Sequence, residues 1–98
     1  MQAIVTWFIP ELGGRKSGAP SGNEYSPNAY FLKPRDASGP EDSEYGSVRF
    51  RFGSADRSIV RLDFWSPQDL SRFVYDGSPF LIMEGPTPVG FARMIEES

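Results

Sequence analysis

Hydrophobic and polar residues alternate cleanly in two segments near the middle of the chain. Residues 48–52 read Val-Arg-Phe-Arg-Phe, and residues 59–65 read Ile-Val-Arg-Leu-Asp-Phe-Trp. Successive side chains of a strand point to opposite faces, so each segment has one apolar and one charged face. We therefore predict two half-buried strands, with Val, Leu and Phe facing the core and Arg61 and Asp63 facing out.

Four more segments are rich in β-branched and aromatic residues and predict further strands. They cover residues 2–9, 28–33, 79–84 and 89–95. The first is apolar on both faces, which indicates a strand covered on both sides or a strand at a partner surface. Six strands joined at short intervals are typical of an all-β barrel, so we predict a single six-stranded antiparallel β-barrel over residues 1–98.

The segments between these strands have the composition of turns and loops. The chain contains 10 Gly and 9 Pro, which break helices and favour turns. Residues 11–27 and 34–46 are expected to be long loops. Residues 66–70 predict a turn or a single helical turn that starts at an N-capping serine, Ser66. The Asp-Gly pair at 76–77 is of the hairpin type, and residues 84–88 predict the last tight connection.

Composition narrows the classes of function. The chain has no Cys and no His, which removes thiol nucleophiles, disulfides, His-based acid–base catalysis and the common zinc sites. Carboxylates alone could hold Ca²⁺ or Mg²⁺, but no Asp-x-Asp-x-Asp-Gly pattern occurs. The net charge of −3 disfavours nucleic acid as a partner, because phosphate binding needs a basic surface. We expect a protein that is not an enzyme and has no cofactor.

The sequence also bears on location. The apolar run from Ala3 to Ile9 is short, lacks a basic leader and is followed by Pro10, so we expect no signal peptide. No stretch has the length of a transmembrane helix, so no membrane association is expected. A chain without Cys is compatible with the cytosol, and we expect a cytoplasmic protein.

Two groups of short motifs lie near the two ends of the chain. The first is Gly13-Gly14-Arg15-Lys16, followed by Tyr25-Ser26-Pro27-Asn28-Ala29-Tyr30-Phe31. The second is Asp76-Gly77-Ser78-Pro79-Phe80, with Glu84-Gly85 and Val89-Gly90 after it. Together they resemble the third domain of the elongation factor Tu family, which is the antiparallel barrel at the end of that translation GTPase. The resemblance covers most of the chain, whereas residues 34–58 align by pattern only.

The resemblance implies a barrel without a GTPase domain, and hence a binding function. In the family this barrel helps to hold the T stem of aminoacyl-tRNA, packs against the GTPase domain and contacts the nucleotide-exchange factor. Lys16 replaces a family His, and Ser26, Met83 and Thr87 replace three family arginines. Arginine makes bidentate, charge-assisted contacts that these residues do not provide, so binding of tRNA by this surface is doubtful.

The matched motifs supply the candidate binding residues. These are Arg15, Lys16, Tyr25, Asn28, Tyr30 and Glu84. Arg15 and Lys16 could grip a phosphate or an acidic protein patch. The alternative is a solvated loop that Arg15 ties down. Trp7 and at least one tyrosine of the 25–30 segment are expected to be partly exposed, because Trp and Tyr suit interfaces.

Two charged groups have both a structural and a functional interpretation. Arg49, Arg51, Arg57 and Arg61 could form a basic stripe for RNA, or an ordinary polar sheet face balanced by Asp56 and Asp63. The acidic residues Glu41, Asp42 and Glu44 could bind a basic partner, although such a loop is usually only solvated. We favour the structural interpretation for both groups.

The sequence thus predicts a stand-alone, non-catalytic binding module that engages an unidentified protein partner. It could act as a mimic or decoy of the elongation factor. The alternative is an RNA- or tRNA-binding accessory of translation, in which Arg15, Lys16 and the strand arginines contact phosphates. An electrostatic criterion separates the two: a continuous positive stripe favours RNA, and an apolar patch rimmed by mixed charge favours protein. The sequence leaves the oligomeric state open.

Overall fold

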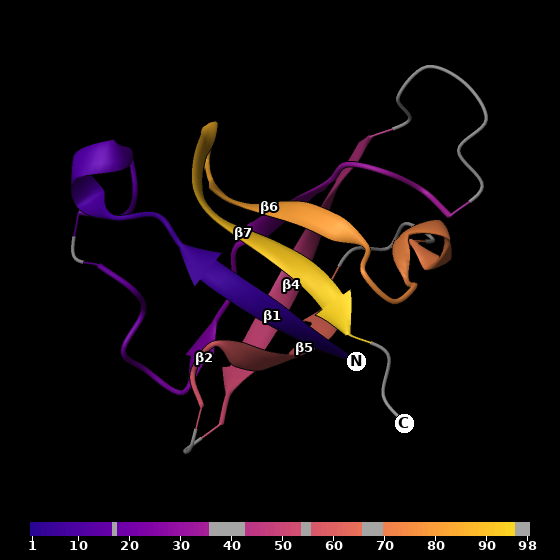
Figure 1. Ribbon diagram of the computed structural model, residues 1–98, viewed down its shortest axis with the longest axis horizontal. Helices are drawn as coiled ribbons and strands as arrows, with labels where there is room; N and C mark the ends of the chain where they lie inside the picture. Colours follow the sequence, from indigo (N-terminus) through magenta and orange to yellow (C-terminus); the bar gives the residue numbers. More distant parts are fainter. Residues whose placement is uncertain (17, 36–42, 54–55, 66–69, 96–98) are drawn as a thin grey trace.

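The strands of the molecule form one closed sheet (Figure 1). The computed structural model describes residues 1–16, 18–35, 43–53, 56–65 and 70–95. The strands are β1 (Gln2–Trp7), β2 (Glu24–Tyr25), β3 (Asn28–Phe31), β4 (Glu44–Phe52), β5 (Ile59–Phe64), β6 (Pro79–Glu84) and β7 (Thr87–Ile95). Two short 3₁₀ turns, η1 (Pro10–Leu12) and η2 (Ser71–Phe73), complete the elements.

Strand pairing closes the sheet into a barrel. The strand order is β2-β4-β3-β6-β7-β1-β5, and the additional pairing of β4 with β5 joins the two ends. Every pair is antiparallel. The prediction of an all-β, six-stranded antiparallel barrel is confirmed, with β2 as one extra short strand.

The extra strand β2 continues the line of β3. Tyr25 lies opposite Phe50 of β4, and Asn28 lies opposite Ser47, so both strands pair with β4 in one register. Between them Pro27 has no backbone N–H to donate, which interrupts the strand. The ladder still passes through Pro27, because its carbonyl oxygen accepts a 3.1 Å hydrogen bond from the Val48 amide.

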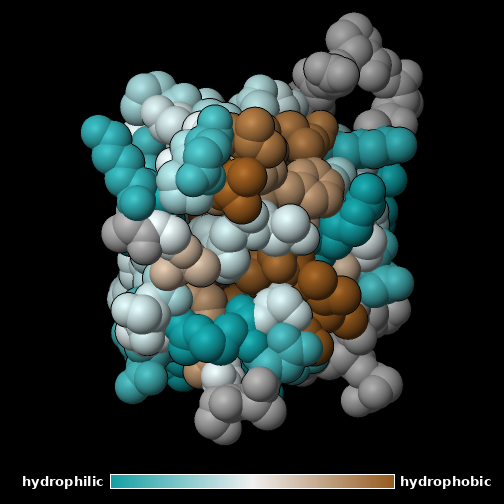
Figure 2. Space-filling model, turned by 60° about the vertical axis from the view of Figure 1, so that its left-hand side comes forward, coloured by the Kyte–Doolittle hydropathy of each residue, from teal (hydrophilic) through white to brown (hydrophobic). Residues whose placement is uncertain are grey.

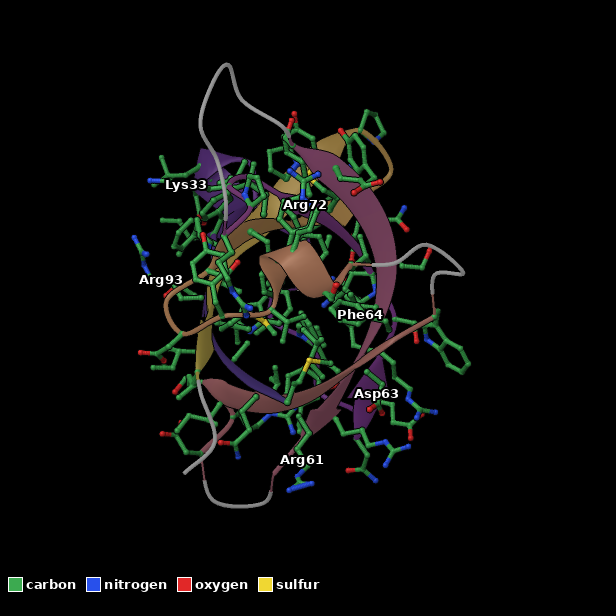
Figure 3. All side chains as sticks on the ribbon, turned by 90° about the vertical axis from the view of Figure 1, so that its right-hand side faces the viewer. Lys33, Arg61, Asp63, Phe64, Arg72 and Arg93 are labelled. Carbon is green, nitrogen blue, oxygen red and sulfur yellow. The ribbon has the colours of Figure 1, made fainter. Side chains whose placement is uncertain are left out.

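Aromatic side chains fill the barrel. Phe31, Phe50, Phe73 and Phe80 are fully buried, and the ring centroid of Phe31 lies 5.2 Å from that of Phe73 and 5.1 Å from that of Phe80. Phe73 belongs to η2, which lies across one end of the barrel (Figure 3). Phenylalanine side chains from β3, β4, β6 and η2 therefore make up much of the interior.

The two alternating segments also have the predicted orientation. The apolar residues of β4 and β5 at even positions point inward, and Val48, Val60 and Leu62 are buried. Arg61 and Asp63 lie on the outside of the barrel (Figure 3). The strand β4 is longer than predicted and begins at Glu44, because residues 44–47 pair with β3.

Strand β1 differs from its prediction in two ways. It ends at Trp7 rather than at residue 9, because the chain turns into η1. It is also covered on one side: Ala3 and Val5 are buried, whereas Ile4 is 49% exposed on the outer face. The expectation of a strand covered on both sides is therefore not met among the described residues, and the alternative of a strand at a partner surface stays a prediction.

Three loop predictions have different outcomes. The long loop predicted for 11–27 contains η1 and β2, which are too short to show a periodic pattern. The hairpin assignment for 76–77 is wrong, because this turn connects η2 to β6 rather than two strands. The tight connection is confirmed at residues 85–86, between β6 and β7. Ser66, the predicted cap, and the acidic residues 41–42 lie outside the described residues.

Candidate functional site

Three of the six candidate residues form one polar cluster, although they come from distant parts of the sequence. Arg15 Nε donates a 2.7 Å hydrogen bond to Glu84 Oε2 at the end of β6. The Tyr25 hydroxyl donates a second, short hydrogen bond to the same oxygen. The Arg15 guanidinium also lies 5.1 Å from the centre of the Tyr25 ring, within the range of a cation–π contact.

The cluster holds a proton on the phenol and a negative charge on the carboxylate. The hydrogen bond from Tyr25, followed by that from Arg15, lowers the pKa of Glu84 below its ordinary value. Partial burial, followed by the hydrogen bond to Glu84, raises the pKa of Tyr25 above its ordinary value. At neutral pH the cluster is therefore a neutral phenol and an ion pair. Neither group has a pKa suited to acid–base chemistry near neutrality.

The loop that carries Arg15 is tightly folded against the end of β1. The Gly14 amide donates a 3.0 Å hydrogen bond to the Ile9 carbonyl. A Cβ atom on Gly14 would lie 1.9 Å from the Phe8 carbonyl oxygen, so only glycine fits at this close approach. A second arm of the Arg15 guanidinium donates 2.7 Å to the Gly18 carbonyl. These contacts fit the alternative in which Arg15 ties its loop down.

Lys16 lies next to this cluster but is exposed. It borders a shallow, solvent-open depression of about 430 Å³. The depression is lined by Gly14, Arg15, Lys16, Glu84, Thr87 and Val89. Because Glu84 supplies a negative charge beside Lys16, the depression has mixed charge and is not a purely basic phosphate site.

The remaining two candidates, Asn28 and Tyr30, are not part of the cluster. Asn28 Oδ1 accepts a 3.3 Å hydrogen bond from the Ser47 hydroxyl of β4. The Tyr30 ring packs 4.5 Å from the ring of Tyr45, and its hydroxyl lies 2.6 Å from the Ser43 hydroxyl. Both side chains face the neighbouring strand β4. Trp7, Tyr25 and Tyr30 are each partly exposed, as predicted.

An apolar surface adjoins the loop of Arg15. It consists of Trp7, Phe8, Ile9 and Leu12, which line a second solvent-open depression. Ile9 is 55% exposed and Leu12 is 77% exposed. Figure 2 shows hydrophobic side chains gathered in the middle of this side of the molecule, flanked by hydrophilic ones. The sequence signalled this surface only through the apolar outer face of residues 2–9, and Ile9 and Leu12 were not identified as site residues.

Three of the four arginines of the sheet face have acceptors, whereas Arg61 is exposed and has no side-chain hydrogen bond or ion pair among the described residues. Arg49 donates a 2.9 Å hydrogen bond to Asp63, and its guanidinium lies 4.8 Å from the centre of the Trp65 ring. Arg51 lies 3.7 Å from Asp63 and 3.8 Å from Glu24. These contacts confirm that Asp63 balances this part of the face.

Arg57 is occupied in a different way. Its guanidinium donates to the carbonyl oxygens of Pro20 and Gly22 at 2.6 and 2.9 Å. It also lies 4.4 Å from the centre of the Phe52 ring. The side chain thus holds the loop before β2 in place, and the predicted balance by Asp56 is replaced by backbone acceptors.

Within the described ranges, His, Cys, Asp and Glu side chains nowhere gather in a group of three that could hold a metal ion. The described residues also include no helix that is long and apolar enough to cross a membrane. Comparison with protein-family models, curated proteins and solved structures finds no match to this chain.

Proposed function

We propose that this barrel is a non-catalytic protein-binding module. Its contact surface is the apolar surface of Trp7, Phe8, Ile9 and Leu12, with the Arg15–Lys16 loop as its rim. The observation that carries the proposal is the exposure of two large aliphatic side chains on one turn, 55% for Ile9 and 77% for Leu12. Contiguous exposed apolar side chains with a polar rim are characteristic of protein interaction sites.

The charge at the rim is mixed, which also supports a protein partner. Glu11 lies on η1 and Lys16 follows the same loop. Arg15 is held by Glu84, so its charge is partly compensated while its position is fixed. A rim of fixed, mixed charges around an apolar centre gives specificity toward a complementary protein surface.

The RNA alternative has weaker support. Arg49 and Arg51 are paired with carboxylates, and Arg57 is occupied by backbone carbonyls. Phosphate binding would have to break these contacts or compete with them. The criterion of a continuous positive stripe therefore counts against RNA as the partner.

The resemblance to the elongation factor barrel suggests one form that the proposed function could take. A module with this architecture could occupy the place of the factor on one of its protein partners and so act as a mimic or decoy in translation.

The proposal is tested by affinity capture from lysate of the native cell, with and without nuclease. The wild-type barrel is compared with Leu12→Ser, which removes an exposed apolar side chain and leaves the core intact. We expect a partner protein that survives nuclease and is lost with Leu12→Ser. The matched control is Tyr45→Ser, since Tyr45 is 53% exposed on a different strand. Capture that is abolished by nuclease would contradict the proposal.

A further inference from the structure

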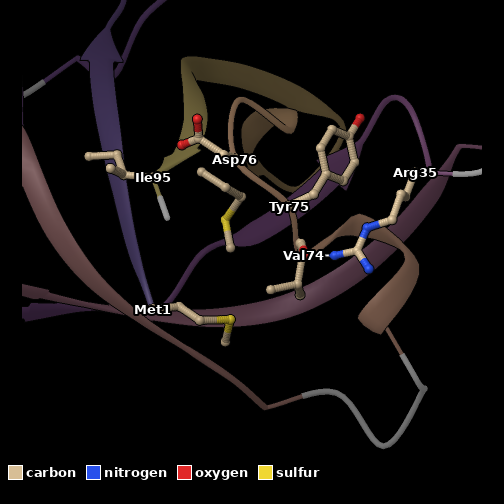
Figure 4. Close-up of a pocket in the computed structure, with 7 residues that line it drawn as sticks. Met1, Arg35, Val74, Tyr75, Asp76 and Ile95 are labelled. Atoms are coloured by element: carbon tan, nitrogen blue, oxygen red, sulfur yellow. Dashed lines mark hydrogen bonds between the residues drawn. The ribbon is translucent and has the colours of Figure 1, made fainter. Parts of the chain in front are cut away.

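A pocket opens at the other end of β1 from the apolar surface. Its volume is about 360 Å³. It is lined by Met1, Arg35, Val74, Tyr75, Asp76, Met94 and Ile95 (Figure 4). Binding pockets for small molecules start at roughly 300 Å³, so this pocket is at the small end of that range.

The pocket has apolar walls and one cationic side. The methionine, valine and isoleucine side chains and the Tyr75 ring form the walls. The Arg35 guanidinium lies on the opposite side from Asp76 (Figure 4). One guanidinium N–H group donates to the Val74 carbonyl oxygen, and the guanidinium lies 6.0 Å from the centre of the Tyr75 ring.

Arg35 is held in place by the backbone around it. Its own amide donates a 2.7 Å hydrogen bond to the Arg72 carbonyl. The Tyr75 hydroxyl donates 2.8 Å to the Lys33 carbonyl, which joins the two segments a second time. The cationic side and the aromatic wall are thus fixed before a ligand arrives, which reduces the entropy that binding costs.

We propose that this pocket binds a small free monocarboxylate with an apolar body. A guanidinium has five N–H donors, and one arm here is engaged by Val74, which leaves a fork for a carboxylate. The apolar body would lie against Met94 and Ile95. This inference is independent of the proposed protein-binding function.

The test uses two eight-carbon probes that differ only in their end group: octanoate and octanamide. Each is titrated into the ¹⁵N-labelled protein while amide resonances are followed by NMR. We expect octanoate to shift the amides of Val74, Tyr75 and Ile95, with a dissociation constant of about 1 mM or lower. Octanamide should bind about tenfold more weakly, since it lacks the charge that Arg35 would pair with.

Two charge-matched variants locate the carboxylate. Arg35→Gln should weaken octanoate binding about tenfold and leave octanamide unchanged. Lys33→Gln removes the same charge from an exposed side chain outside the pocket and should leave both affinities unchanged. Equal binding of octanoate and octanamide by the wild-type protein would overturn the proposal, and that comparison holds even if Arg35→Gln disturbs the fold. Shifts confined to residues outside the pocket would also overturn it.

Discussion

Arg15 and Glu84 are separated by 69 positions in the sequence and meet at 2.7 Å between Nε and Oε2. This contact joins the loop after η1 to the end of β6, just before the turn into β7. Because the same loop packs on the end of β1, the ion pair also positions the rim of the proposed binding surface. The Arg15–Glu84 ion pair on the outside of the barrel thereby holds the loop that borders the apolar surface.

Replacement of Glu84 by Gln should lower stability at neutral pH and have no effect in acid. Gln keeps the shape and an acceptor oxygen but removes the charge that Arg15 and Tyr25 stabilise. The Arg15 and Glu84 side chains are 22% and 41% exposed, so we expect the free energy of unfolding to fall by up to about 1 kcal/mol at pH 7. Urea denaturation at several pH values measures the free energy of unfolding.

The direction of the pH effect follows from the lowered pKa of Glu84. A depressed pKa in the folded state gives stability that is present above the ordinary value of 4.5 and is lost as the pH falls through the lowered pKa. The two proteins should therefore converge in acid. Glu11→Gln is the control, since Glu11 is an exposed carboxylate on η1. A difference that persists at the same size below pH 3 would contradict the ion-pair explanation.

Tyr25 should ionise at a higher pH than an ordinary tyrosine. Partial burial and the hydrogen bond to Glu84 raise the pKa of Tyr25 above 10.0. A raised pKa gives stability that is fully present below pH 10 and is lost as the pH rises through the folded-state pKa. Absorbance of tyrosinate during alkaline titration measures this. Tyr25→Phe should remove the part of the absorbance change that occurs at the highest pH. Loss of a part at lower pH instead would show that Tyr25 is not held by Glu84.

Gly77→Val should damage folding much more than Lys16→Ala. Gly77 has φ +84°, and nothing lies within 4 Å of a Cβ atom built there, so the cost is backbone strain rather than a clash. A β-branched residue in this conformation costs about 1–3 kcal/mol. Lys16 is exposed, and its truncation should change stability by less than about 0.5 kcal/mol. Thermal unfolding compares the two, and equal melting temperatures would contradict the strain argument.

The sequence predicted the fold better than it predicted the site. Alternation in β5 and the apolar run of β6 identified both strands, and β6 was bounded correctly at Pro79–Glu84. The alternation of apolar and polar residues failed to predict the strand bounds where strand pairing or side-chain packing decided them. Buried Gly46 interrupts the alternation of β4, since a Cβ atom there would lie 2.6 Å from the Leu70 side chain. The need for glycine at position 46 depends on its contact with Leu70, which is distant in sequence, so a local pattern does not reveal it.

The site was partly predictable for the same physical reason. The motifs contained Arg15, Tyr25 and Glu84, but only folding shows that one carboxylate oxygen accepts from both of the others. Asn28 and Tyr30 belong to the same motif as Tyr25 but lie outside the cluster. They are two positions apart on β3, so their side chains share its outer face, where they contact β4. Leu12 carried no signal, since an isolated leucine in a loop is ordinarily unremarkable.

The last prediction concerns tRNA. The affinity of tRNA for this barrel would come largely from Lys and Arg side chains that neutralise its phosphates, so it would fall steeply as the salt concentration rises. The net charge of −3 opposes the encounter, and Arg49 and Arg51 are already paired with carboxylates. Met83 is only 5% exposed and has no charge to offer.

We therefore expect no tRNA binding tighter than about 10⁻⁴ M at physiological salt, the weak end of non-specific affinity. Fluorescence titration with aminoacylated and free tRNA at two salt concentrations is the measurement. Asp63→Asn serves as a positive comparison, since it frees Arg49 from its ion pair, leaves Arg51 with Glu24 alone and should strengthen any residual binding at low salt. Micromolar binding by the wild-type protein that weakens as salt rises would favour the RNA alternative over the protein-binding module.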